Sequence, residues 1–93
     1  MHLLRAMLLL AIFADAAVAA EKHATFSVSN MTCALCPLTV KTAISQVPGV
    51  NSVEVSQAVG QASVIFDDTR TTTDAIAAAS TNAGYPAIEI RAQ

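Results

Sequence analysis

The sequence is poor in positive charge and in aromatic side chains. It has five lysines and arginines against seven aspartates and glutamates, one tyrosine and no tryptophan. Beyond the first twenty residues the aromatic side chains are Phe26, Phe66 and Tyr85. Proteins that bind nucleic acid usually present a basic surface to the phosphates and aromatic rings to the bases. We therefore expect no nucleic-acid partner.

The sequence also lacks an apolar run long enough to cross a membrane. A spanning helix needs roughly 18 apolar residues or more, and Asp15 interrupts the apolar run at the N-terminus. Arg5 precedes this run and small residues follow it, which is the layout of a secretory signal peptide. We expect residues 1–20 to be cleaved on export. Residues 21–93 then form one small, mildly acidic domain without stable membrane insertion.

Hydrophobic periodicity in the mature chain predicts four short strands and two helices. Alternating apolar residues indicate half-buried strands, and apolar residues at helical spacing indicate amphipathic helices. The expected elements are strands over 24–29, 50–56, 62–66 and 87–91 and helices over 35–47 and 71–83. Pro37 is tolerated in the first turn of its helix. We expect Ala83 to be buried on the second helix, and Ile88 and Ile90 to point inward from the last strand.

The order of these elements predicts the fold class. It is the βαββαβ order of an α+β, ferredoxin-like sandwich. Such a fold has one four-stranded antiparallel sheet with both helices on one face. A domain of about 73 residues buries only roughly 60% of its unfolded surface. We therefore expect no large internal cavity, and a functional site on a loop at the rim.

The two cysteines, Cys33 and Cys36, are the most informative residues. An exported protein meets an oxidising compartment, where paired cysteines often form structural disulfides. A bridge across two intervening residues closes almost no loop, so it adds little stability. Metal binding and thiol redox chemistry remain as alternatives. Cys33 lies in a predicted loop and Cys36 at the start of a predicted helix, whose N-terminus favours the negatively charged thiolate.

Two thiolates are soft ligands and select soft metal ions such as Cu(I). Mercuric ion is softer still and prefers two sulfurs in a line. A closed structural zinc site normally needs four ligands, and this motif offers two. Hg(II) with two thiolates is neutral, whereas Cu(I) with two thiolates keeps a negative charge that a nearby lysine would offset. No lysine is adjacent to the motif in sequence, which favours Hg(II) over the alternative, Cu(I).

The stretch Met31-Thr32-Cys33-Ala34-Leu35-Cys36 resembles the MTCxxC motif of heavy-metal-associated domains. The resemblance continues through Val47-Pro48-Gly49-Val50, Phe66-Asp67-Asp68-Thr69 and Ala83-Gly84-Tyr85-Pro86. Asn30 stands where that family usually has glycine, and it also tolerates a positive φ angle. The export signal and Pro37 make the chain most similar to the periplasmic, mercury-binding members of the family.

The resemblance implies a periplasmic carrier of Hg(II) in mercury detoxification. Such a carrier binds one ion through Cys33 and Cys36 and passes it, by exchange of thiol ligands, to a cysteine pair on an inner-membrane mercury transporter. It is not an enzyme, and a monomer is the simplest state. A periplasmic Cu(I) chaperone of the same fold is the first alternative. A thiol–disulfide oxidoreductase is the second, although the chain is short for a thioredoxin-like fold.

Five other residues invite a functional interpretation but have a simpler structural one. Met31 could be a third soft ligand, but methionine usually fills a core. Tyr85 could shield the metal or pack beside the loop. Asp67 and Asp68 suggest a hard-cation site, yet such sites need six or more oxygens, so a solvated connection is expected. His23 is expected to be solvated.

Overall fold

The structure, a computed structural model, describes residues 21–92. The predicted signal peptide at residues 1–20 lies outside the described residues and stays a prediction. The elements, in chain order, are β1 (Glu21–Val28), α2 (Cys36–Ser45), β2 (Val50–Ser56), β3 (Gln61–Asp67), α3 (Thr73–Asn82) and β4 (Ala87–Ala92). No helix in the described part of the chain has the length and apolar character needed to cross a membrane.

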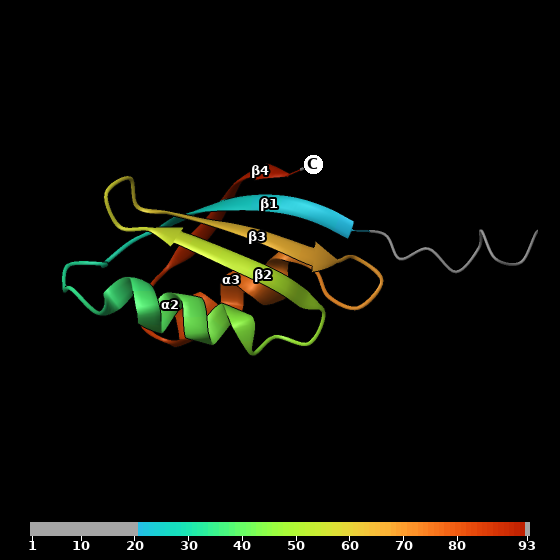
Figure 1. The fold of residues 1–93 in the computed structure, drawn as a ribbon, viewed down its shortest axis with the longest axis horizontal. Helices are drawn as coiled ribbons and strands as arrows, with labels where there is room; N and C mark the ends of the chain where they lie inside the picture. The colour runs from blue at the N-terminus through green and yellow to red at the C-terminus, as the bar shows by residue number, and fades with distance from the viewer. Residues whose placement is uncertain (1–20, 93) are drawn as a thin grey trace, which may run out of the picture.

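The four strands form one antiparallel sheet in the order β2-β3-β1-β4. Both helices lie on the same face of this sheet, as Figure 1 shows. The expected βαββαβ sandwich is therefore confirmed. Strand and helix bounds differ from the expected ones by up to three residues, most at β1, which begins at Glu21 because it pairs with β3 along its length.

The core lies between the sheet and the helices. Phe26 of β1 is fully buried and is opposite Ala62 of β3 in the register. The side chains of the two central strands therefore point into the core side by side. The helices close the core with Val40 and Ile44 of α2 and with Ile76 of α3, all fully buried. These side chains recur at helical spacing, which is why the sequence predicted them as buried.

Three inward positions were predicted wrongly. Ile88 and Ile90 of β4 are 70% and 50% exposed. The register pairs Ile88 with the exposed Ser27, while Phe26, which points inward, is paired with Glu89. The pairing of β4 with β1 also shifts between Thr25 and Phe26, so alternation in the sequence does not fix which face β4 buries.

The other wrong position is in α3, where Ala83 is exposed and Ser80 is fully buried instead. Ala83 is the C-cap residue that follows the last residue of α3. The Oγ of Ser80 donates a hydrogen bond of 2.7 Å to the carbonyl oxygen of Tyr85, which satisfies the buried hydroxyl. At the start of α3, Thr72 is the N-cap, and its side chain accepts a hydrogen bond from the N–H of Ala75.

The face of the sheet away from the helices is open and mixes polar with apolar side chains. A shallow groove crosses it between β1, β2 and β3, and Arg91 of β4 reaches the same groove. The polar residues that line it are His23, Thr25, Ser52, Glu54, Ser63 and Arg91. Both helices cover the opposite face of the sheet, so this face stays open to solvent.

Candidate metal site

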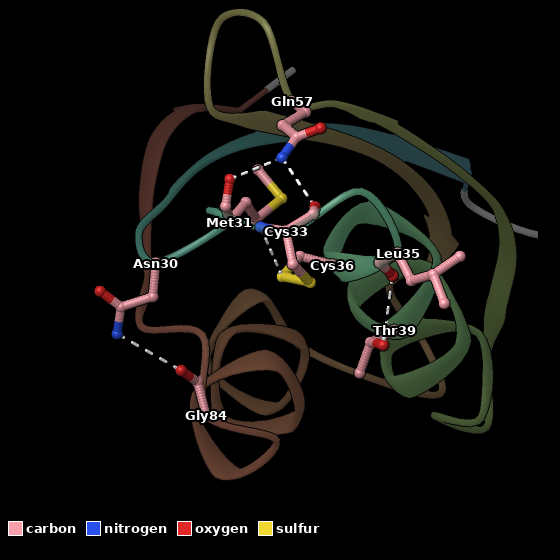
Figure 2. The surroundings of a disulfide bond; sticks show 8 residues. All are labelled: Asn30, Met31, Cys33, Leu35, Cys36, Thr39, Gln57 and Gly84. Atoms are coloured by element: carbon pink, nitrogen blue, oxygen red, sulfur yellow. Dashed lines mark hydrogen bonds between the residues drawn. A yellow bond between two sulfur atoms is a disulfide. The ribbon is translucent and has the colours of Figure 1, made fainter.

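The two cysteines lie at the end of the sandwich where β1 leads into α2. Cys36 is the first residue of α2 and is 4% exposed, whereas Cys33 is in the preceding loop and is exposed. The Cα atoms are 5.2 Å apart and the sulfurs form a disulfide bond. Figure 2 shows the sulfur pair beside the start of the helix. The structure thus brings both predicted residues together at the rim.

The first turn of α2 surrounds Cys36 with backbone groups. The N–H of Cys33 lies 3.2 Å from the sulfur of Cys36 and donates to it. The N–H of Cys36 in turn donates to the carbonyl oxygen of Cys33, also over 3.2 Å. Leu35 stands at the N-cap and makes no side-chain cap. The amino end of the helix is therefore open toward the sulfurs, an environment that favours anionic sulfur.

The loop before Cys33 is anchored to the rest of the fold at Asn30. Asn30 has φ of +71°, the left-handed conformation that its side chain tolerates, as expected. Its side-chain N–H donates to the carbonyl oxygen of Gly84 over 3.4 Å, which ties the loop to the connection between α3 and β4. Met31 packs against the core cluster, so its expected structural role is confirmed.

A second anchor of this loop, Gln57, is not indicated by any pattern in the sequence. It is in the turn between β2 and β3, and its side-chain N–H₂ donates to the carbonyl oxygens of Met31 and Cys33, each over 2.8 Å. Both bonds appear in Figure 2. Polar residues are ordinary in turns, and the partners lie 26 and 24 residues away in the chain. No local pattern could have indicated this contact.

Tyr85 lies in the connection before β4, and its structural role is clear. It is half-buried and packs against the core cluster. Its N–H donates to the carbonyl oxygen of Ser80 over 3.0 Å, and its own carbonyl oxygen accepts from the Ser80 hydroxyl. These bonds fix the backbone of the connection, and packing against the core is the role of the side chain that the structure shows.

Asp67 and Asp68 are not arranged as a cation site. Asp67 ends β3, and its Oδ1 accepts hydrogen bonds from the N–H and the hydroxyl of Thr69. These two bonds hold the pKa of Asp67 below its usual value, and the bond from the hydroxyl has the larger effect. His23 is exposed, as expected. Within residues 21–92, no three or more His, Cys, Asp and Glu side chains gather as a metal cluster.

Residues 25–86 match the model of the heavy-metal-associated domain. The chain is 46% identical over 86 residues to the mercuric transport protein periplasmic component of Acinetobacter calcoaceticus. This match covers 92% of this chain and 94% of that protein.

Among solved structures, oxidised MerP from Ralstonia metallidurans CH34 is 44% identical with a TM-score of 0.75, and the mercury-bound form of MerP is 42% identical with a TM-score of 0.69. Each match covers 77% of this chain and 100% of the other. A copper-binding domain from HMA7, a P-type ATPase, is 28% identical with a TM-score of 0.75, covering 77% of this chain and 97% of that domain.

Proposed function

The chain belongs to the heavy-metal-associated domain family, and we propose that it is a periplasmic carrier of one mercuric ion held by Cys33 and Cys36. The observation that carries this proposal is the pair of sulfurs at the rim of the fold, one on an exposed residue and one on a buried residue. The likeness to a mercury-bound relative supports Hg(II) as the cargo.

The disulfide in the structure is the oxidised form of this site. Its sulfurs are bonded to each other and have no thiolate charge with which to bind a cation. Uptake therefore needs a dithiol reductant, which supplies two electrons and two protons and becomes a disulfide itself. The two thiols of the carrier then lose their protons to solvent as they bind Hg(II), and the bis-thiolate complex is neutral.

Release follows from the unequal exposure of the two cysteines. An incoming thiolate from a partner reaches the ion from the side of Cys33, which faces solvent. A third sulfur–mercury bond forms, then the bond to one carrier sulfur breaks, and that thiolate takes a proton from water. A second exchange moves the ion completely. We propose that the receiver is an inner-membrane mercury transporter with its own cysteine pair, that the carrier acts as a monomer, and that no enzymatic reaction takes place.

The test is uptake by the purified, reduced protein. We expect one Hg(II) per chain by mass spectrometry under native conditions, and none in Cys33→Ser or Cys36→Ser after washing with a monothiol. Transfer to a peptide containing a cysteine pair should then proceed to equilibrium within the mixing time of the experiment. Stoichiometric uptake by the double serine variant would contradict the assigned ligands.

Cu(I) is the second candidate cargo, because a copper-binding domain shares the fold at 28% identity. A competition experiment with both ions and the reduced protein decides between them. Retention of Hg(II) with Cu(I) displaced supports the proposal, and preference for Cu(I) would overturn it. An assay for catalytic reduction of a disulfide substrate tests the oxidoreductase alternative, for which turnover beyond one equivalent is the decisive result.

A further inference from the structure

Gln57 joins the hairpin of β2 and β3 to the loop between β1 and α2, two parts of the molecule that are far apart in the sequence. Its backbone belongs to the turn between β2 and β3, where the pairing of Ser56 with Gln61 holds the hairpin. Its side chain reaches the loop between β1 and α2 and bonds to two carbonyl oxygens there. The side-chain nitrogen of Gln57 donates both of its hydrogens and thus connects the hairpin to the loop that contains Cys33 (Figure 2).

The two cysteines depend on different supports. Cys36 is buried, and it is fixed by α2, whose Val40 and Ile44 lie in the core. Cys33 is exposed and precedes the helix. Its carbonyl oxygen accepts two hydrogen bonds, one from the N–H of Cys36 and one from Gln57. The bond from Gln57 is the one of these that comes from outside the cysteine motif, so it fixes Cys33 relative to the sheet.

Resting on the proposed function, we propose that Gln57 is a positioning residue that holds Cys33 over the first turn of α2, so that the two thiols act as one pair toward a soft metal ion. Two groups held in register react as if at high local concentration, and loosening one of them lowers that concentration. Without the bond from Gln57, the thiol of Cys33 is as reactive as before but samples more positions. The two cysteines then bind a metal ion, or form their disulfide, less readily.

The first experiment measures closure of the pair without metal. Purified protein is equilibrated with mixtures of reduced and oxidised dithiothreitol, and the fraction of disulfide is read by trapping free thiols. We expect Gln57→Leu to shift the equilibrium toward the dithiol by about threefold to tenfold, the factor expected for one to two exposed hydrogen bonds. Gln57→Glu should shift it at least as far, because a carboxylate faces the same two carbonyl oxygens without a hydrogen to donate.

The second experiment measures retention of Hg(II) against competing dithiothreitol. The Gln57 variants should lose the ion to the competitor about threefold to tenfold more readily than the unchanged protein. The matched controls are Gln46→Leu and Gln46→Glu, which make the same changes at an exposed glutamine at the far end of α2. We expect these controls to stay within about twofold in both experiments.

The two experiments separate this inference from the proposed function. If the unchanged protein fails to retain Hg(II), the proposed cargo is wrong, and the dithiothreitol equilibrium still decides the role of Gln57. If Gln57→Leu and Gln57→Glu leave that equilibrium at the control value, the inference is overturned. The same holds if they lower only the melting temperature, since a purely structural role predicts that result.

Discussion

At the scale of single residues, the two cysteines are buried to different extents. Substitution of either should therefore abolish metal binding, but only one substitution should lower stability. Both are proposed as ligands, but only Cys36 is in the core, at 4% exposure. In the reduced protein, Cys36→Ser should lower the free energy of unfolding by about 1–2 kcal/mol, because a hydroxyl replaces a weakly polar thiol in a buried site. Cys33→Ser, at an exposed position, should change it by less than about 0.5 kcal/mol.

Urea unfolding of both reduced variants checks this difference, with mercury uptake measured on the same samples. Both variants should lose the ion, although only one loses stability. Equal losses of stability at the two positions would show that Cys33 is as buried in solution as Cys36.

Asp67 gives the protein a stability contribution that depends on pH. The hydroxyl and N–H of Thr69, with the charge of Arg70, lower the pKa of this carboxyl from its usual 3.8. A group with a lowered folded pKa stabilises the protein above its unfolded pKa, and this contribution is lost as the pH falls through the folded value. We expect Thr69→Val to reduce stability at pH 7, and the difference from the unchanged protein to shrink on acidification below 3.8.

Urea titrations at neutral and acidic pH measure this effect. Thr39→Val is the control, because its hydroxyl donates to the carbonyl oxygen of Leu35, which does not titrate over this range. Its effect should be the same at both pH values. A Thr69→Val effect that is likewise independent of pH would remove Asp67 as the cause.

The sequence was sufficient to find the cysteine pair but not what holds it. The spacing of Cys33 and Cys36 and the adjacent helix start are local features, so they are visible in the sequence. The bonds from Gln57 and Asn30 join segments 24 to 54 residues apart. Such contacts depend on how the hairpin and the helices are placed, which no short pattern encodes.

At the scale of elements, the order of helices and strands could be predicted because each buries a periodic apolar face. Val40 and Ile44 mark α2, and Phe26 with its alternating neighbours marks β1. The failure at β4 has a physical cause. β4 is an edge strand with one neighbour, and its register with β1 pairs Ile88 with the exposed Ser27. Ile88 therefore faces solvent although alternation favoured the opposite.

The connection from α2 to β2 depends on Gly49. Its φ is +101°, and a Cβ at this position would be 2.9 Å from the Cβ of Arg70 and 3.1 Å from Cγ2 of Thr71. Gly84 has a similar φ of +103° but open space around it. We expect Gly84→Ala to cost about 1 kcal/mol from backbone strain alone. Gly49→Ala should cost about 2–3 kcal/mol because steric overlap adds to that strain.

Thermal or urea unfolding of these two alanine variants compares the costs directly. Gly84→Ala serves as the control for the unfavourable backbone angle, so the excess at Gly49 reports the close approach of the segment after β3. Equal costs would mean that Arg70 and Thr71 move aside freely.

At the scale of the whole molecule, the redox state of the Cys33–Cys36 pair decides whether the carrier can bind a metal ion. We expect the oxidised protein to take up no Hg(II) and the same sample to bind one equivalent after treatment with a dithiol. Both forms should keep the same far-ultraviolet circular dichroism, since the bond closes a loop of two intervening residues and constrains the chain little. Binding by the oxidised protein, with its free thiols shown to be absent, would contradict this expectation.

The open sheet face has a consequence for how a carrier meets other molecules. This face mixes serines, threonines and charged groups with exposed apolar side chains such as Ile88. Exposed apolar side chains that stand singly among polar ones give little area for a lasting contact. Contacts of other proteins with this face should therefore be brief, and the carrier would remain free to diffuse between partners.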